Sequence, residues 1–359
     1  MKKTLVSGVQ SSGTIHIGNY FGAIKQNIEL ANSGEYDSFI FIADYHSMTT
    51  LTDREARLKS TFDTACVYLA CGLDVSKAAL FKQSDVPAHT ELAWILNTVT
   101  PMSMLNLAHS YKDKVQNSEE DLNQENQNSK INAGLFTYPI LMAADILIYN
   151  AEVVPVGSDQ KQHVEYAREI AGKYNRTYNK NHMHAIAKAY SDFSFKMPQA
   201  YIKEEVATVP GLDGTKMSKS KGNVLPLFAS DEDLKKAVFN IVTDSARPED
   251  KKIVLGDAEN NIPQNNIYAI HALFLNQEEK EILKSKFENA SIENPYGYKQ
   301  AKDELLATVI KYISPMREKY SYYQNNPAEV LNILTEGKIK AKLVADVNIK
   351  IIRQQVGLE

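Results

Sequence analysis

The strongest signal for the fold is Leu5-Val6-Ser7-Gly8-Val9-Gln10-Ser11-Ser12-Gly13-Thr14-Ile15-His16-Ile17-Gly18-Asn19, near the start of the chain. An apolar run leads into a glycine-rich turn, and a helix is expected to begin near Gly18. A helix that starts after a tight turn leaves backbone N–H groups free to bind phosphate. Because Gly18 has no Cβ, a nucleotide ring can lie against the backbone there.

Short apolar runs alternate with helical patterns through the first half of the chain. The runs predict strands at 4–9, 38–43, 79–83 and 153–156, and helices are expected at 22–31, 54–71, 90–98, 133–149 and 161–174. This alternation is typical of a parallel sheet with crossover helices. Ligands in such folds bind at the carboxyl ends of the strands, where the glycine-rich turn lies.

The pattern changes along the chain and predicts its domain organisation. Residues 1–225 are expected to form an α/β domain with a Rossmann-like parallel sheet. Helical periodicity dominates afterwards, which predicts an α-helical domain at 226–328 and C-terminal helices at 329–359 that pack back on the first domain. Residues 117–130 hold a single large apolar side chain, so we expect a mobile insertion there.

A second motif, Lys216-Met217-Ser218-Lys219-Ser220, lies near the middle of the chain and is followed by Lys221-Gly222. Lysine is a compact, mobile point charge, so two lysines on a flexible loop suit the oxygens of a triphosphate. Taken alone, such a pentamer is more often a solvated basic loop. The glycine-rich turn upstream favours the phosphate interpretation.

The net charge of the chain excludes the class of nucleic-acid-binding proteins whose whole surface is basic. The chain has 40 Lys+Arg and 44 Asp+Glu, a net charge of −4, so RNA contacts must come from local patches. Two candidates are residues 338–342 and the trio Lys311, Arg317 and Lys319. A solvated helix face is an equal alternative for each patch.

The composition of the chain predicts where the protein is located and whether it holds a metal centre. Polar residues interrupt any apolar core soon after the basic start, and no stretch approaches the length of a membrane span. We therefore expect a cytoplasmic protein without a membrane partner. Cys66 and Cys71 lie five positions apart on a predicted helix, on different faces, so a protein-held zinc or iron–sulfur centre is not expected.

The two motifs together resemble the paired signatures of the class I aminoacyl-tRNA synthetases. The lysine motif matches in full, whereas the first reads His16-Ile17-Gly18-Asn19, with Asn19 in place of the family's second histidine. The resemblance implies ATP as a substrate, with Mg²⁺ held mainly by its phosphates. It implies catalytic roles for His16, Lys114, Lys216 and Lys219, and ATP binding by Gln10, Ser11, Ser12, Gly18, Asn19, Gly157, Ser158, Asp159, Val206, Lys216, Met217, Ser218, Lys219 and Ser220.

Two further segments, 137–145 and 154–163, resemble the tryptophan-specific branch of that family, whose nearest relatives are specific for tyrosine. On a helix, Tyr138, Met142 and Asp145 share one face. An ionised Asp145 only accepts hydrogen bonds, and the indole N–H of tryptophan is a donor. Tyrosine-specific relatives carry glutamine where this chain has Met142. The expected tryptophan-binding residues are Val6, His46 at the rim, Tyr138, Met142, Asp145, Val154, Val156 and Gln160. His46 can equally be a satisfied core histidine, and the alternative for Asp145 is a helix carboxylate bonded to a neighbour.

The resemblance implies ATP-dependent activation of L-tryptophan and its transfer to tRNA(Trp), with the helical domain reading the anticodon and a homodimer as the working form. Two alternatives stay open. One is a tyrosine-specific relative, and the other is a non-catalytic descendant that binds tryptophan, a nucleotide or RNA.

Overall fold

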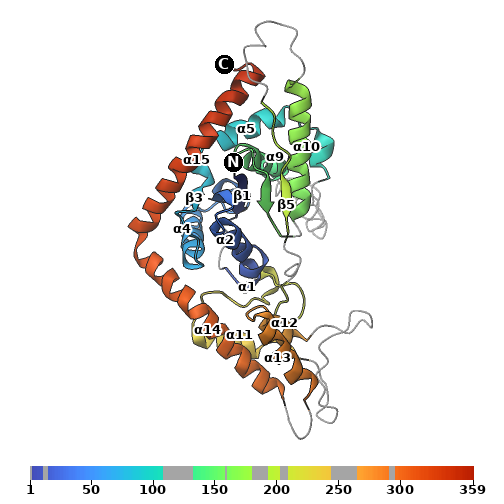
Figure 1. The fold of residues 1–359 in the computed structure, drawn as a ribbon, viewed down its shortest axis with the longest axis vertical. Coiled ribbons are helices and arrows are strands. Elements are labelled where there is room, and N and C mark those ends of the chain that lie inside the picture. Colours follow the sequence, from blue (N-terminus) through green and yellow to red (C-terminus); the bar gives the residue numbers. More distant parts are fainter. Residues whose placement is uncertain are drawn as a thin grey trace.

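The computed structural model describes residues 2–10, 15–107, 132–157, 160–179, 193–202, 209–243, 265–290 and 296–359. The expected insertion at 117–130 lies outside these ranges. Figure 1 shows a sheet-based part in the centre and a helical part below it, with two long C-terminal helices along one side of both.

In the described ranges, the centre of the fold is a parallel sheet of five strands in the order β3-β2-β1-β4-β5. The first four strands coincide with the predicted ones to within two residues at each end. The fifth was not predicted, because it has only three residues, two of them exposed, and no apolar run marks it. The strands are β1 (Lys3–Val9), β2 (Tyr36–Ile42), β3 (Ala78–Lys82), β4 (Val153–Pro155) and β5 (Gln199–Tyr201).

Helices cover both faces of the sheet. They are α1 (Ile17–Asn19), the π-helical turn η1 (Tyr20–Ile24), α2 (Lys25–Asn32), α3 (Asp44–Ser47), α4 (Arg54–Ala70), the short 3-10 turn η2 (Gln83–Asp85), α5 (Ala88–Asn97), α6 (Met102–Leu105), α9 (Ala133–Leu147) and α10 (Lys161–Tyr178). Alternate strand residues point to opposite faces. Leu5, Ile40 and Leu80 pack with α2 and α4, whereas Phe39, Phe41 and Phe81 pack with α5 and α9.

The helical part follows the lysine motif. It comprises α11 (Asp231–Phe239), α12 (Asn266–Ala272), α13 (Gln277–Glu288) and α14 (Tyr298–Asn325), and α15 (Pro327–Val356) then returns along the sheet. Its core is continuous with one face of the sheet. The ring of Phe21 meets Phe274 at 5.0 Å, and the hydroxyls of Tyr20 and Tyr312 lie 3.1 Å apart. The helix that begins at the glycine-rich turn therefore rests directly on the helical part.

Helix α15 protects an edge of the sheet. Strand β3 is an outer strand, and an exposed edge strand invites unwanted pairing. Helix α15 lies against it so closely that a Cβ on Gly337 would come within 1.9 Å of the carbonyl oxygen of Leu80. Only glycine allows this approach of the two backbones.

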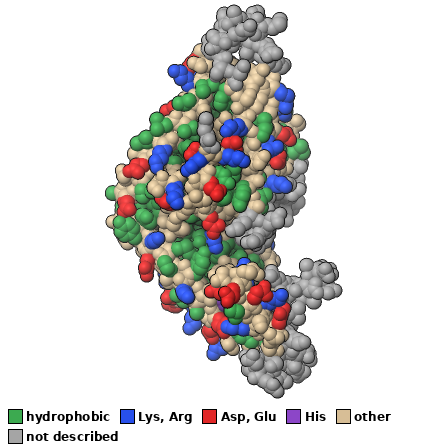
Figure 2. Space-filling view, in the orientation of Figure 1, with side chains coloured by type: hydrophobic (Ala, Val, Ile, Leu, Met, Phe, Trp, Pro, Cys, Tyr) green, Lys and Arg blue, Asp and Glu red, His purple; other side chains and the backbone are tan. Residues whose placement is uncertain are grey.

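The surface carries charges of both signs. Figure 2 shows basic and acidic side chains interspersed on the visible face. Several cations of the two predicted RNA patches make contacts within the protein. Arg317 pairs with Asp231 at 2.7 Å, Lys342 pairs with Asp346 at 3.0 Å, and Lys340 donates to the carbonyl of Val75. Across the part of the chain that the structure describes, no helix is both long enough and apolar enough to cross a membrane.

We predict that Gly337→Ala destabilises the protein, although alanine is the better helix former. Intrinsic propensity favours alanine by about 1 kcal/mol, but the added methyl meets backbone that cannot move aside, and overpacking costs about 1–3 kcal/mol or more. Urea unfolding measures the change. Gly172→Ala in α10 is the matched control, because its Cβ would approach only the flexible end of Arg176 at 3.2 Å. Equal stability changes in the two variants would contradict the prediction.

Candidate active site

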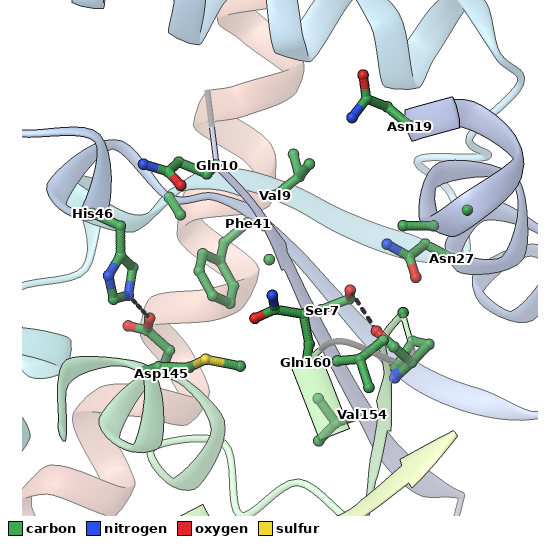
Figure 3. A pocket seen from close by; sticks show the side chains of 18 of the residues that line it. Ser7, Val9, Gln10, Asn19, Asn27, Phe41, His46, Asp145, Val154 and Gln160 are labelled. Carbon is green, nitrogen blue, oxygen red and sulfur yellow. Dashed lines mark hydrogen bonds and ion pairs between the residues drawn. The ribbon is translucent and has the colours of Figure 1, made fainter. Parts of the chain in front are cut away.

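A cavity of about 400 Å³ opens at the carboxyl ends of β1 and β4. The order of the sheet reverses between these two strands, which is where doubly wound folds bind their ligands. The walls come from β1, the glycine-rich turn, α9, the segment after β4 and the lysine loop. Figure 3 shows Gln10, Asn19, His46, Asp145 and Gln160 arranged around it.

The glycine-rich turn and the lysine loop are joined through the backbone. Ile17 N donates to Leu225 O at 3.0 Å, and Leu227 N donates to Ile15 O at 3.0 Å. A Cβ on Gly18 would lie 2.8 Å from Nδ1 of His16 and 3.3 Å from Cβ of Met217. The two motifs are therefore neighbours in space, and the glycine lets them pack together.

The lysine loop is held in shape by Asn223. The buried side chain of Asn223 accepts from the backbone N–H of Ser218 at 2.8 Å and donates to Asp213 at 2.7 Å. Met217 is buried, whereas Lys216 and Lys219 are exposed. Lys216 lines the cavity. The loop is thus anchored by its methionine, and Lys216 reaches the wall of the cavity.

His16 is a neutral imidazole near neutral pH. Burial, together with the nearby cation of Lys219, lowers its pKa to about 4. Its Nδ1 atom is buried and finds no hydrogen-bond partner among the described residues. Asn19, in the position of the family's second histidine, accepts from the backbone N–H of His16 at 3.2 Å and so stabilises the start of α1. The turn presents a polar but uncharged ring to the cavity.

The opposite wall holds a fully buried carboxylate, Asp145. Its oxygens face His46 Nε2 at 3.0 Å, His89 Nδ1 at 2.6 Å and Gln83 Nε2 at 2.8 Å. Burial alone would raise the pKa of Asp145, but the hydrogen bonds and charges of the two histidines outweigh it and hold the pKa below its usual value. Asp145 is therefore an ionised acceptor at the edge of the cavity.

Three residues that were predicted to share one face of a helix do so on α9. Tyr138, Met142 and Asp145 all line the cavity, and the hydroxyl of Tyr138 lies 3.8 Å from the sulfur of Met142. The ring of Tyr138 meets the ring of His46 edge-on at 4.6 Å. His46 is only 5% exposed, so it lies deeper than the rim position expected for it. Its contact with Asp145 makes it part of the buried network.

Most of the predicted site residues lie together around the cavity. Ser218, Lys219 and Ser220 are described but do not line it, and Ser11, Ser12, Lys114, Ser158, Asp159 and Val206 lie outside the described residues. Those that line it are Val6, Gln10, His16, Gly18, Asn19, His46, Tyr138, Met142, Asp145, Val154, Val156, Gly157, Gln160, Lys216 and Met217.

Two residues of the Asp145 network, Gln83 and His89, were not predicted. Gln83 ends the third predicted strand, and the carboxyl end of a strand is a place to look for site residues in such folds. The position of Gln83 at the end of a predicted strand could therefore have identified it as a candidate site residue. His89 sits in the first turn of α5, and no sequence pattern connects it with a residue on α9.

Comparison with known proteins agrees with this geometry. The family model for tRNA synthetases class I (W and Y) matches residues 2–314. A tryptophan-tRNA ligase of Fusobacterium nucleatum is 45% identical over 358 residues, which cover 100% of this chain and 98% of the relative.

Solved structures are similar over nearly the whole chain. The tryptophanyl-tRNA synthetase from Campylobacter jejuni, complexed with ADP and tryptophan, is 39% identical with a TM-score of 0.78 and covers 99% of both chains. The tryptophanyl-tRNA synthetase from Mycoplasma pneumoniae is 28% identical with a TM-score of 0.80, covering 100% of this chain and 99% of its own.

We predict that His16 makes stability depend on pH between about 6.5 and about 4. The pKa of His16 is lower in the folded protein, so in this window the unfolded chain binds a proton that the folded protein does not, and stability falls as the pH falls. His271, whose pKa burial also lowers to about 4, contributes in the same direction, so the difference between wild type and His16→Asn isolates the effect of His16. Urea unfolding at pH 7 and pH 5 measures it. Parallel pH slopes for the two proteins would refute the assignment.

Proposed function

The chain belongs to the class I tRNA synthetases for tryptophan and tyrosine, and we propose that its cavity activates L-tryptophan with ATP and that the protein transfers the amino acid to tRNA(Trp). The observation that carries the choice of tryptophan is the buried, ionised Asp145 on one wall, facing a cavity whose other wall is the glycine-rich turn. The acceptor on one wall would bind the side chain of an aromatic amino acid, and the phosphate-binding groups on the other wall would bind a nucleotide beside it.

The aromatic side chain would lie between α9 and the strands. Val6, Val154 and Val156 supply apolar walls, and Met142 supplies a polarizable surface for a wide ring. The indole N–H would donate to Asp145. Phenylalanine, which has no such donor, would leave the carboxylate short of a partner, a penalty that reaches about 10⁴- to 10⁵-fold in sites built in this way.

The ammonium and carboxylate groups of the amino acid would lie toward the nucleotide. Tyr138 and Gln160 are proposed to bind the ammonium group, and both line the cavity. Gln160 is oriented by His163, whose Nδ1 lies 2.8 Å from its amide oxygen. The amino acid carboxylate can then point at the α-phosphate, held by the turn.

The chemical step needs alignment and charge stabilisation rather than a protein nucleophile. The amino acid carboxylate attacks the α-phosphorus in line, which forms tryptophanyl-adenylate and releases pyrophosphate. Lys114, Lys216 and Lys219 are proposed to bind the leaving phosphates. Neutral His16 would donate a hydrogen bond near the α-phosphate without adding a second cation beside Lys219.

Magnesium is proposed to enter with ATP. Of the described residues that line the cavity, the one carboxylate is Asp145, which is fully buried on the wall opposite the glycine-rich turn. The donor set near the turn consists of amides, an imidazole and a lysine, which suit phosphate better than Mg²⁺. The ion, held by phosphate oxygens, would neutralise charge on the leaving pyrophosphate.

Transfer to tRNA is proposed to involve the whole chain, working in the cytoplasm. Residues 1–225 would carry the chemistry, 226–328 would read unstacked anticodon bases, and 329–359 would brace the two parts. The contact of Tyr20 with Tyr312 supports communication between them, because it joins the helix after the turn to the helical part.

Two alternatives make different predictions in one assay. A tyrosine-specific relative would catalyse pyrophosphate exchange with tyrosine instead of tryptophan. A non-catalytic descendant would catalyse exchange with neither amino acid. Exchange that depends on tryptophan, followed by acylation of tRNA(Trp), is the result expected from the proposed function.

We predict that Asp145→Ala raises the KM for tryptophan about 100-fold or more and changes the KM for ATP little. The reason is that a hydrogen bond to a buried charge is lost on the tryptophan side alone. Pyrophosphate exchange measures both constants. Asp145→Asn keeps the shape of the side chain and covers the case in which the alanine variant folds poorly. Equal weakening of both substrates would show that Asp145 does not recognise tryptophan.

We also propose that two copies of the chain pair through the surface around Trp94. Trp94, Met102 and Leu107 are 74%, 64% and 56% exposed and lie close together in sequence, on and just after α5. Large apolar side chains that are exposed close together in sequence are candidates for a protein interface. A second copy fits the homodimer implied by the resemblance to the synthetases.

We predict that Trp94→Glu shifts the protein toward monomers, because a charge in an apolar interface costs several kcal/mol. Sedimentation velocity measures the mass. Trp94 is the single tryptophan of the chain, so its fluorescence in the wild type should shift to the blue as concentration rises. Leu343→Glu, at a residue on α15 that is 67% exposed, is the matched control and should leave the mass unchanged. A wild type that stays monomeric at micromolar concentration would rule out this interface.

A further inference from the structure

Behind the tryptophan side of the cavity lies a chain of buried hydrogen bonds. The hydroxyl of Tyr149 lies 2.9 Å from Nε2 of His89, and Nδ1 of His89 lies 2.6 Å from Oδ1 of Asp145. The three residues are at most 2% exposed. They come from α5, α9 and the residues just after α9, so the tertiary fold brings them together.

The direction of these bonds follows from what each group can donate. An ionised Asp145 only accepts, so Nδ1 of His89 must carry a proton. In the neutral form of His89, Nε2 accepts and the hydroxyl of Tyr149 is its donor, and in the protonated form Nδ1 still donates to Asp145. Tyr149 thereby fixes the tautomer that donates to Asp145. Its ring is held in place by stacking on Phe39, with centroids 4.7 Å apart and planes 17° from parallel.

Gln83 is fixed in a similar way. Its amide oxygen accepts from the backbone N–H of Tyr45 at 3.1 Å, so its amide nitrogen must face Asp145. That nitrogen lies 2.8 Å from both oxygens of the carboxylate. A flipped amide would turn an oxygen toward the carboxylate and lose both interactions.

We propose that Gln83 and His89 are positioning residues for tryptophan recognition, which hold the carboxylate of Asp145 in one orientation so that a remaining acceptor site faces the indole N–H. This inference rests on the proposed function and extends it to residues that need not touch the substrate. Neither Gln83 nor His89 is among the residues that line the cavity, whereas Asp145 and His46 are. Figure 3 shows His46 and Asp145 joined at the cavity wall.

The same arrangement favours indole over phenol. The three donors around the carboxylate, on His46, Gln83 and His89, are all engaged by Asp145. An indole N–H only donates, so it needs nothing from them. The hydroxyl of a bound tyrosine could also donate to Asp145. Its oxygen would then lie next to donors that already bind Asp145, so the lone pairs of this oxygen would find no donor of their own. The network therefore discriminates against tyrosine, which a single carboxylate does not do.

The test compares His89→Leu with His89→Asn in pyrophosphate exchange. Leucine removes the donor, whereas the amide nitrogen of asparagine can occupy the place of Nδ1. We expect His89→Leu to raise the KM for tryptophan roughly 10- to 100-fold, the range for losing a hydrogen bond to a charge. The KM for ATP should stay within about threefold, as should both constants in His89→Asn. The preference for tryptophan over tyrosine in kcat/KM should fall in the leucine variant by a factor similar to the rise in KM.

Other outcomes would overturn the inference. If both KM values rise together, or if asparagine is as harmful as leucine, the network supports packing only and does not position Asp145. If circular dichroism shows that His89→Leu does not fold, Gln83→Met takes its place in the test. It removes the donor of the second positioning residue, and its KM values are judged by the same criteria. A wild type without tryptophan-dependent exchange would instead refute the proposed function itself, so the two failures are distinguishable.

Discussion

A buried carboxylate persists only where hydrogen bonds replace the water it has lost, and this constraint governs the wall of the cavity that holds Asp145. Asp145 is fully buried and receives donors from three separate elements, α3, η2 and α5. Helix α3 follows β2, and η2 and α5 follow β3 in turn, so the positions of the donors depend on the register of β2 and β3. The parallel sheet thus sets the geometry of recognition as well as the overall shape.

The wall formed by the glycine-rich turn depends on a different interaction, the backbone pairing of residues 15–17 with 225–227. This pairing joins two motifs that lie about 200 residues apart in sequence. Gly18 allows the close packing of His16 and Met217, and Asn223 holds the lysine loop from within. Lys216 and Lys219 are exposed on the loop, while the buried Met217 anchors it.

Much of the architecture could be predicted from the sequence because it depends on local patterns. Four of the five strands and the helices between them follow from apolar runs and periodicity. The common face of Tyr138, Met142 and Asp145 follows from helical spacing alone, and the cavity contains all three. Strand β5 escaped prediction because an edge strand of three residues has little apolar pattern. His46 lines the cavity and is bonded to Asp145, so it combines the rim position and the core position that the sequence left open.

The sequence by itself determined the order of the first four strands and the helices between them, the glycine-rich and lysine motifs and the chemical type of the residues on α9, because these properties repeat or adjoin along the chain. Only the tertiary structure decided which donors surround Asp145, how the turn meets the lysine loop and where α15 covers the sheet. Gln83, His89 and Tyr149 lie on different elements, and Gly337 meets Leu80 across more than 250 residues. Contacts at such separations depend on how whole elements pack, and no local pattern encodes that packing.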